Sequence, residues 1–191
     1  MKHHTIKSAM RPLLLLMAIT LSIPVFAGNN PLRLKSGSLT PLKDNGGKIF
    51  CEIDFSKCRG NRKPFEQHLI EDFDSSIEEF NREFPTIRKW FCERWDDDIE
   101  KGPKISTDES APLRMKIVVK NCQMGAKSGF GGASISGYAE FYHHGEDTPF
   151  AVIEILKIFG TQMKAPVAGY LGVKQAFNDL AEYICDLIYH N

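Results

Sequence analysis

The chain has 191 residues, with 24 basic and 24 acidic side chains, and 42% of its residues are hydrophobic. This length predicts one domain that is large enough to bury a substantial core. The even charge balance lacks the basic excess that attracts nucleic acid or an anionic membrane surface. We therefore expect no nucleic-acid partner.

Residues 1–27 have the pattern of a secretory signal peptide. Three basic residues come first, an apolar stretch follows from Leu13, and residues 25–27 form a small-residue cleavage site. The apolar stretch is shorter than the ~20 residues that span a bilayer, so we expect cleavage near Ala27 and no membrane span in the mature chain. The residue directly after the cleavage site is Gly28 and not a cysteine, which argues against a lipid anchor. The sequence thus predicts an exported protein, periplasmic or extracellular.

Residues 28–47 are rich in Gly, Pro, Ser and Asn and predict an irregular lead-in, with at most a short strand near residues 38–42. The remainder, residues 48–191, is expected to form a single α/β domain. Apolar and polar side chains alternate with period two in three segments, which indicates half-buried strands. These segments are 48–56, 112–121 and 133–142, and a fourth strand is expected over 148–159.

Helices are predicted where apolar residues recur every three or four positions. One runs from Phe65 to Phe84, where Pro85 is expected to close or kink it. A second covers 86–98, a polar loop follows over 100–112, and a long final helix begins at Pro166 or Gly169.

The expected order is β-α-α-β-β-β-α. Clean alternation in the first three strands indicates a sheet with one face open to solvent, because doubly covered strands read as continuous apolar runs. We therefore predict an α+β fold: a two-layer α/β sandwich with a mixed, mostly antiparallel sheet and helices on one face. The first two strands should be parallel, and the last three should form an antiparallel meander.

This pattern resembles small periplasmic α/β domains of bacterial envelope lipoproteins and of regions beside periplasmic propellers. The resemblance lies in the strand 49–55, the glycine-interrupted strand 132–142, the turn at Gly145 and the closing helix 169–188. The missing lipid-anchor cysteine departs from the lipoprotein members. The resemblance implies envelope assembly or binding of another envelope or secreted protein, rather than chemistry.

Three aromatic residues are expected on the open face of the sheet: Phe50, Tyr138 and Tyr142. Charged neighbours surround them, as polar residues surround the aromatic anchors of protein interfaces. Tyrosines are also common cross-strand partners on exposed sheets. We assign these three residues as the candidate binding surface.

His143 and His144, with Glu146 and Asp147, form the densest set of metal-ligand side chains. Adjacent strand residues point in opposite directions, and no third distant ligand can be assigned, so a solvated hairpin turn around Gly145 is the favoured interpretation. We therefore assign no metal site. A small hydrolase or metal-dependent enzyme using His143 or His144 stays an alternative.

Five cysteines remain after the signal peptide, so at least one thiol is unpaired. Cys58 and Cys122 each follow the carboxyl end of a predicted parallel strand, which makes them a candidate disulfide. No catalytic cysteine signature surrounds any of the five, and Cys51 and Cys185 are interpreted as buried small hydrophobes.

The glycine-rich segment 125–132 leads into a strand rather than a helix, so a phosphate-binding loop is not expected. Trp90, Phe91 and Trp95 line an apolar helix face that could serve a carrier of small apolar ligands, although such residues are more often core. We assign no catalytic residue and no cofactor. The preferred hypothesis is a non-enzymatic exported module for binding or envelope assembly.

Overall fold

The computed structural model describes residues 30–190 apart from 44–45, 126–131, 163–164 and 167–168. The predicted signal peptide therefore lies outside the described residues. Among the helices of the described part, none has the length and apolar character needed to cross a membrane.

The helices are α1 (Thr40–Lys43), α2 (Phe65–Phe73), α3 (Ile77–Asp98) and α4 (Gly169–His190). The main strands are β1 (Leu32–Gly37), β2 (Lys48–Asp54), β5 (Lys104–Ser106), β6 (Leu113–Gln123), β7 (Ser134–His143) and β8 (Ala151–Phe159). Two short hairpins are formed by β3 (Arg59–Gly60) with β4 (Lys63–Pro64), and by β9 (Thr161–Gln162) with β10 (Ala165–Pro166).

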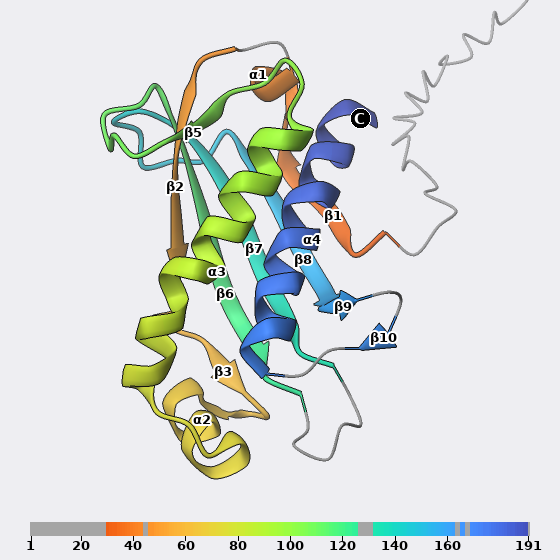
Figure 1. The fold of residues 1–191 in the computed structure, drawn as a ribbon. Coiled ribbons are helices and arrows are strands. Elements are labelled where there is room, and N and C mark those ends of the chain that lie inside the picture. Colours follow the sequence, from red (N-terminus) through yellow and green to blue (C-terminus); the bar gives the residue numbers. More distant parts are fainter. Residues whose placement is uncertain (1–29, 44–45, 126–131, 163–164, 167–168, 191) are drawn as a thin grey trace, which may run out of the picture.

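The central sheet has the strand order β1-β8-β7-β6-β2-β5. β2 runs parallel to β5 and β6, whereas β6, β7, β8 and β1 pair antiparallel in that order. The long helices α3 and α4 lie side by side over one face of this sheet (Figure 1). The fold is therefore α+β with a mixed, mostly antiparallel sheet, and the predicted parallel pair and meander are confirmed.

The core lies between this sheet and the two long helices. Inward-facing side chains alternate along the strands: Ile49 and Cys51 on β2, Leu113, Met115, Ile117 and Val119 on β6, and Ile135, Ala139 and Phe141 on β7 are all at most 2% exposed. They meet the apolar stripes of α3 and α4, so the period-two and period-3.6 patterns identify the two sides of one core.

The lead-in contains more structure than its composition predicted. β1 pairs antiparallel with β8 at the edge of the sheet, and its Leu32 is 5% exposed. The segment around residues 38–42, expected to be at most a short strand, includes the helix α1 instead. Pro41 suits the first turn of a helix because it has no N–H to leave unpaired.

The helix boundary expected at Pro85 is wrong, because Pro85 lies inside α3. The break comes earlier, at Asp74, whose left-handed backbone (φ 55°) ends α2. Ser76 then caps α3 by accepting a hydrogen bond from the backbone N–H of Glu79, 3.1 Å away. A Ser followed three residues later by Glu is a helix-start pattern. Beyond Pro85 the fully buried Ile87 holds the helix against the core.

The predicted polar loop over 100–112 also contains a strand. Its residues 104–106 form β5, which extends the sheet beside β2.

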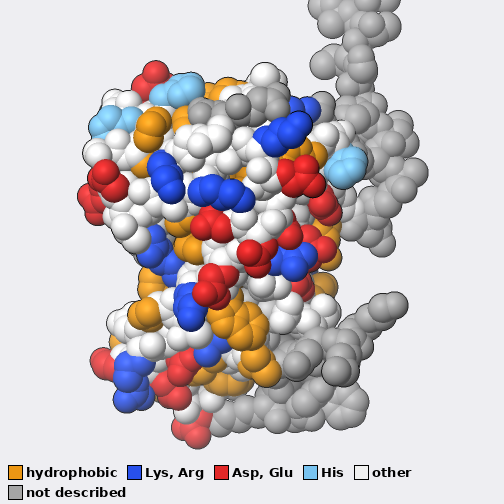
Figure 2. Space-filling view, turned by 45° about the horizontal axis from the view of Figure 1, so that its top comes forward, with side chains coloured by type: hydrophobic (Ala, Val, Ile, Leu, Met, Phe, Trp, Pro, Cys, Tyr) orange, Lys and Arg blue, Asp and Glu red, His pale blue; other side chains and the backbone are white. Residues whose placement is uncertain are grey.

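On the helix side, acidic and basic side chains are interleaved without a patch of one sign (Figure 2). Ion pairs there include Arg94 with Glu182 and Lys174 with Glu83.

Candidate functional site

The open face of the sheet carries the three predicted aromatic residues. Strand register places Phe50, Arg114 and Tyr142 in one row across β2, β6 and β7. Tyr138 lies two rows away, opposite Val118. In the described part of the chain, α3 and α4 both lie on the other face (Figure 1). The three aromatic residues therefore share a face, but only Phe50 and Tyr142 share a row.

Tyr142 is packed within this face and is only 7% exposed. The Arg114 guanidinium lies 4.5 Å from the centre of its ring, and its hydroxyl donates to Oε2 of Glu140 at 2.6 Å. Burial, with the hydrogen bond to Glu140, raises the pKa of Tyr142 to about 12. Tyr142 thus packs against Arg114 in this row and exposes little surface to a partner.

Most charges near the middle of the face are already paired. Lys116 Nζ lies 3.3 Å from Glu52 and 3.1 Å from Asp54, and hydrogen bonding to Asp54 raises the pKa of Lys116. Lys35 Nζ lies 4.7 Å from the centre of the Tyr138 ring. Such partly exposed pairs contribute little net stability, but they hold the side chains in a regular arrangement.

An open groove of about 430 Å³ lies at the end of this face where β2 and β6 begin and β7 ends. Phe50 and Arg114 form part of its wall. Glu52 on β2, the end of β7, the β7–β8 turn and the segment before β6 complete it. The remaining lining residues are Glu52, Glu109, His143, His144, Gly145, Glu146 and Asp147. The groove brings the predicted aromatic residue Phe50 together with the predicted histidine turn. Sequence reasoning treated these as separate features.

The two histidines adopt the hairpin arrangement that the turn pattern predicted. Gly145 has φ +77°, and the backbone N–H of His144 bonds to the carbonyl of Pro112 at 2.9 Å. The His143 ring lies 4.7 Å from the Phe150 ring. Within the described residues, neither imidazole hydrogen-bonds to a carboxylate or a thiol, so the turn holds no oriented acid–base pair. No group of three or more His, Cys, Asp or Glu side chains there is placed to hold a metal ion.

Cys58 and Cys122 lie close together, as the parallel crossover predicted. Arg59 pairs with Asn121 in the sheet, and the backbone of Cys122 hydrogen-bonds to the Cys58 thiol. Both residues are free thiols in the structure, and their disulfide stays a prediction. Burial raises the pKa of Cys58 to about 12 and the pKa of Cys122 well above its usual value, which does not favour a nucleophile.

The aromatic residues proposed for a ligand carrier pack into the core. Phe91 and Trp95 are fully buried, with ring centres 6.3 Å apart, and Trp90 is half-buried. The Trp95 indole N–H donates to the carbonyl of Pro103 at 2.8 Å. Their contacts are those of structural core residues.

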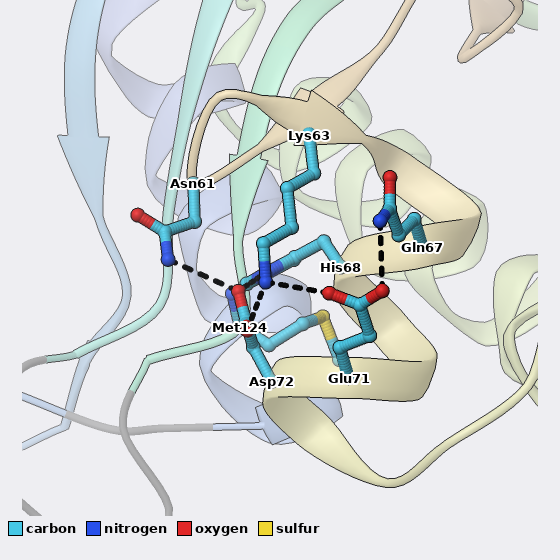
Figure 3. Close-up of polar contacts among 7 residues, drawn as sticks. All are labelled: Asn61, Lys63, Gln67, His68, Glu71, Asp72 and Met124. Atoms are coloured by element: carbon cyan, nitrogen blue, oxygen red, sulfur yellow. Dashed lines mark hydrogen bonds and ion pairs between the residues drawn. The ribbon is translucent and has the colours of Figure 1, made fainter.

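A polar cluster that sequence reasoning missed lies between α2 and the end of β6 (Figure 3). His68 is 3% exposed, and its Nδ1 lies 2.9 Å from Oδ2 of Asp72. Lys63 and Asn61 also bind the Asp72 carboxylate, at 2.7 Å and 3.0 Å. The spacing of His68 and Asp72, four residues on one helix, was the available signal.

The β3–β4 hairpin supplies the other half of this cluster. Asn61 and Arg62, its two turn residues, both have positive φ (47° and 66°), as a two-residue hairpin of the matching twist requires. Gly60 packs on the His68 ring so closely that an added Cβ would come within 2.1 Å of it. The buried imidazole of His68 thus contacts both the β3–β4 hairpin, at Gly60, and the chain just after β6, at Met124.

Comparison with known protein families gives no match, and comparison with curated proteins gives none. Among solved structures, the chain is similar to a PelC dodecamer from Paraburkholderia phytofirmans in space group P6, with a TM-score of 0.42 and 10% identity. A substituted PelC dodecamer in space group C2 gives 0.43 and 11%. Each match covers 80% of this chain and 95% of the other. Similarity at this level carries no argument about function or assembly.

Proposed function

We propose that this chain is an exported, non-enzymatic binding module that holds a basic segment of another exported protein in the groove at the end of its open sheet face. The predicted signal peptide supports the location. The sheet face opposite α3 and α4, which no described helix covers, supports a role in binding. Among the described residues, neither His143 nor His144 hydrogen-bonds to a carboxylate or a thiol, which favours binding over the hydrolase alternative.

The charge of the groove is the observation that carries the proposal. Four carboxylates line it, from Glu52, Glu109, Glu146 and Asp147. Glu52 already pairs with Lys116, which leaves three carboxylates against the Arg114 guanidinium. That guanidinium already lies over the Tyr142 ring. A lysine or arginine side chain entering the groove would therefore meet an excess of negative charge, and electrostatic complementarity of this kind selects partners and speeds their association.

Phe50 gives the groove an apolar element beside the carboxylates. Aromatic faces attract cations, and the stems of Lys and Arg pack well on apolar surface. The arrangement thus suits a basic side chain along its whole length. Tyr138, farther along the same face, would contact the rest of the bound segment.

The test is binding of a short labelled peptide of alternating lysine and glycine, followed by fluorescence anisotropy. The double variant Glu109→Gln/Glu146→Gln removes two carboxylates from the groove. If each contributes about 0.7 kcal/mol, as partly exposed ion pairs do, the dissociation constant should rise about tenfold.

Glu93→Gln/Asp97→Asn is the charge-matched control, because both residues are exposed carboxylates on α3, where Glu93 pairs with Lys89 at 3.6 Å. It should change the affinity by less than a factor of two. Equal losses in both variants would show that only the overall charge matters. Unchanged binding in the groove variant would also reject the proposal.

A further inference from the structure

Two cysteines that sequence reasoning did not connect are in contact in the core. Cys51 faces inward from β2, and Cys92 lies on α3 above it. The Cys51 and Cys92 thiols lie close enough for each to shift the pKa of the other. The two residues are 41 positions apart, so the crossing of α3 over the sheet creates the pair.

A second bond, independent of the sulfurs, fixes this crossing. Arg88 lies one turn before Cys92 on α3, and its guanidinium donates to the backbone carbonyl of Cys51 at 3.1 Å. This hydrogen bond therefore joins α3 to β2 at Cys51. Cys92 lies one turn after Arg88 on the same face of α3.

The two thiols differ in their access to solvent. Cys51 is 1% exposed, whereas Cys92 is half-buried. Cys92 is thus the residue of the pair that is more accessible to a reagent from solution. This is the arrangement of an attacking thiol next to a resolving thiol.

The pKa values of the two thiols also differ, and the more accessible Cys92 is the more acidic of the two. Hydrogen bonding with Cys51 lowers the pKa of Cys92 against an opposing effect of burial, and the Arg88 guanidinium also lowers it. Glu93 and Asp96 oppose this effect. The same interaction, together with burial, raises the pKa of Cys51. Cys92 is therefore the better nucleophile, because the thiolate is the reactive form.

We propose that Cys51 and Cys92 form a redox-active dithiol that accepts an external disulfide, with Cys92 as the attacking residue. The Cys92 thiolate attacks one sulfur of the external disulfide, whose other sulfur leaves as a thiolate and takes up a proton. Cys51 then loses its proton and attacks the Cys92 sulfur in this mixed disulfide. The second external thiol departs, so the dithiol is oxidised by two electrons and the external disulfide is reduced to two thiols.

The oxidised form would join α3 covalently to β2, at Cys51, which lies between the groove residues Phe50 and Glu52. This consequence is separate from the proposed binding of a basic segment, and it holds or fails without it. An oxidising compartment supplies disulfides of the required class.

The test exposes the purified chain to oxidised glutathione, blocks remaining thiols with N-ethylmaleimide and analyses tryptic peptides by mass spectrometry. Cys51 and Cys92 fall in peptides 49–57 and 90–94, each with one cysteine. We expect these two peptides to be joined. In Cys51→Ser, we expect one glutathione trapped on Cys92, and in Cys92→Ser neither product.

Cys185→Ser is the control, because Cys185 is buried and should leave the reaction unchanged. A second measurement uses the reduced wild-type chain and needs no variant to fold: Cys92 should react with iodoacetamide at least tenfold faster than the other four thiols. A first adduct on another cysteine, or a bridge only between Cys58 and Cys122, would overturn the proposal.

Discussion

The backbone N–H of Met124 donates a hydrogen bond to Nε2 of His68 at 3.4 Å, across 56 positions of sequence. Because Nε2 accepts, the ring proton lies on Nδ1 and is donated to Asp72, 2.9 Å away. Both ring nitrogens are thus occupied, and the side chain is almost fully buried. His68 links α2 to the end of β6 and is a positioning residue, although an Asp–His pair is a common feature of catalytic sites.

Removal of this imidazole should destabilise the protein. His68→Ala leaves the buried Met124 N–H without its acceptor, which costs about 1–3 kcal/mol in the free energy of unfolding. Urea denaturation measures the loss. His190→Ala is the control, because His190 is exposed and bonds only within its own helix, to the carbonyl of Asp186. A His68→Ala protein as stable as the control would contradict this role.

Asp72 should make the stability depend on pH in the acid range. The hydrogen bond from Lys63, followed by those from His68 and Asn61, lowers the pKa of Asp72. A carboxyl group whose pKa is lower in the folded state stabilises the fold above its ordinary pKa, near 4, and loses that contribution as the pH falls.

Denaturation of the wild type from pH 6 down to pH 2 should therefore show a decline in stability that Asp72→Asn flattens. Asp97→Asn removes an exposed carboxylate from α3 and is the charge-matched control. A decline of equal slope in all three proteins would show that Asp72 does not carry the effect.

Tyr142 should make the stability of the protein fall as the pH rises in the alkaline range. Burial and the hydrogen bond to Glu140 raise its pKa to about 12, so the folded protein holds the phenolic proton more tightly than the unfolded chain. Its contribution is complete below about pH 10 and is lost as the pH rises toward 12. Burial also raises the pKa of Tyr170 and of Tyr183, so tyrosinate absorbance should show several late-titrating groups, of which Tyr142→Phe removes one. Tyr138→Phe should leave all of these late groups in place.

Gly160 should tolerate no side chain. An added Cβ would lie 1.8 Å from the backbone oxygen of Gly172, where the end of β8 meets α4. Relief of such a clash requires a backbone shift, and overpacking of this kind costs about 1–3 kcal/mol or more. Thermal denaturation should place Gly160→Ala well below the wild type. Gly46→Ala, whose Cβ would meet only the Lys101 carbonyl at 4.0 Å, should unfold within about one degree of it.

The layers of the fold could be predicted because each depends on a local repeat. The alternation around Ile49 and around Met115 identifies strands with one wet face. The edge strand β1 was missed because its alternation rests on two leucines, Leu32 and Leu34, within a segment rich in turn-forming residues. Pro85 does not end the helix, because packing of the following turns against the core retains it.

The candidate sites depend on contacts that no local pattern fixes. Alternation places Phe50 and Tyr142 on one face, but only the register of three strands puts them in one row. Glu109 reaches the groove from a loop whose path no periodicity determines. Contact between Cys51 and Cys92 likewise depends on the angle and height at which α3 crosses β2. These contacts depend on how the elements pack in three dimensions, so the sequence alone does not reveal them.

The central claim, that the groove on the open face receives a basic segment, is tested most directly by chemical-shift mapping of the ¹⁵N-labelled protein with the lysine–glycine peptide. The largest amide shifts should fall at Phe50, Glu109 and Gly145, with smaller shifts near Tyr138 and none along the exposed surface of α3 and α4. Shifts confined to those helices, or spread evenly over the protein, would contradict the account.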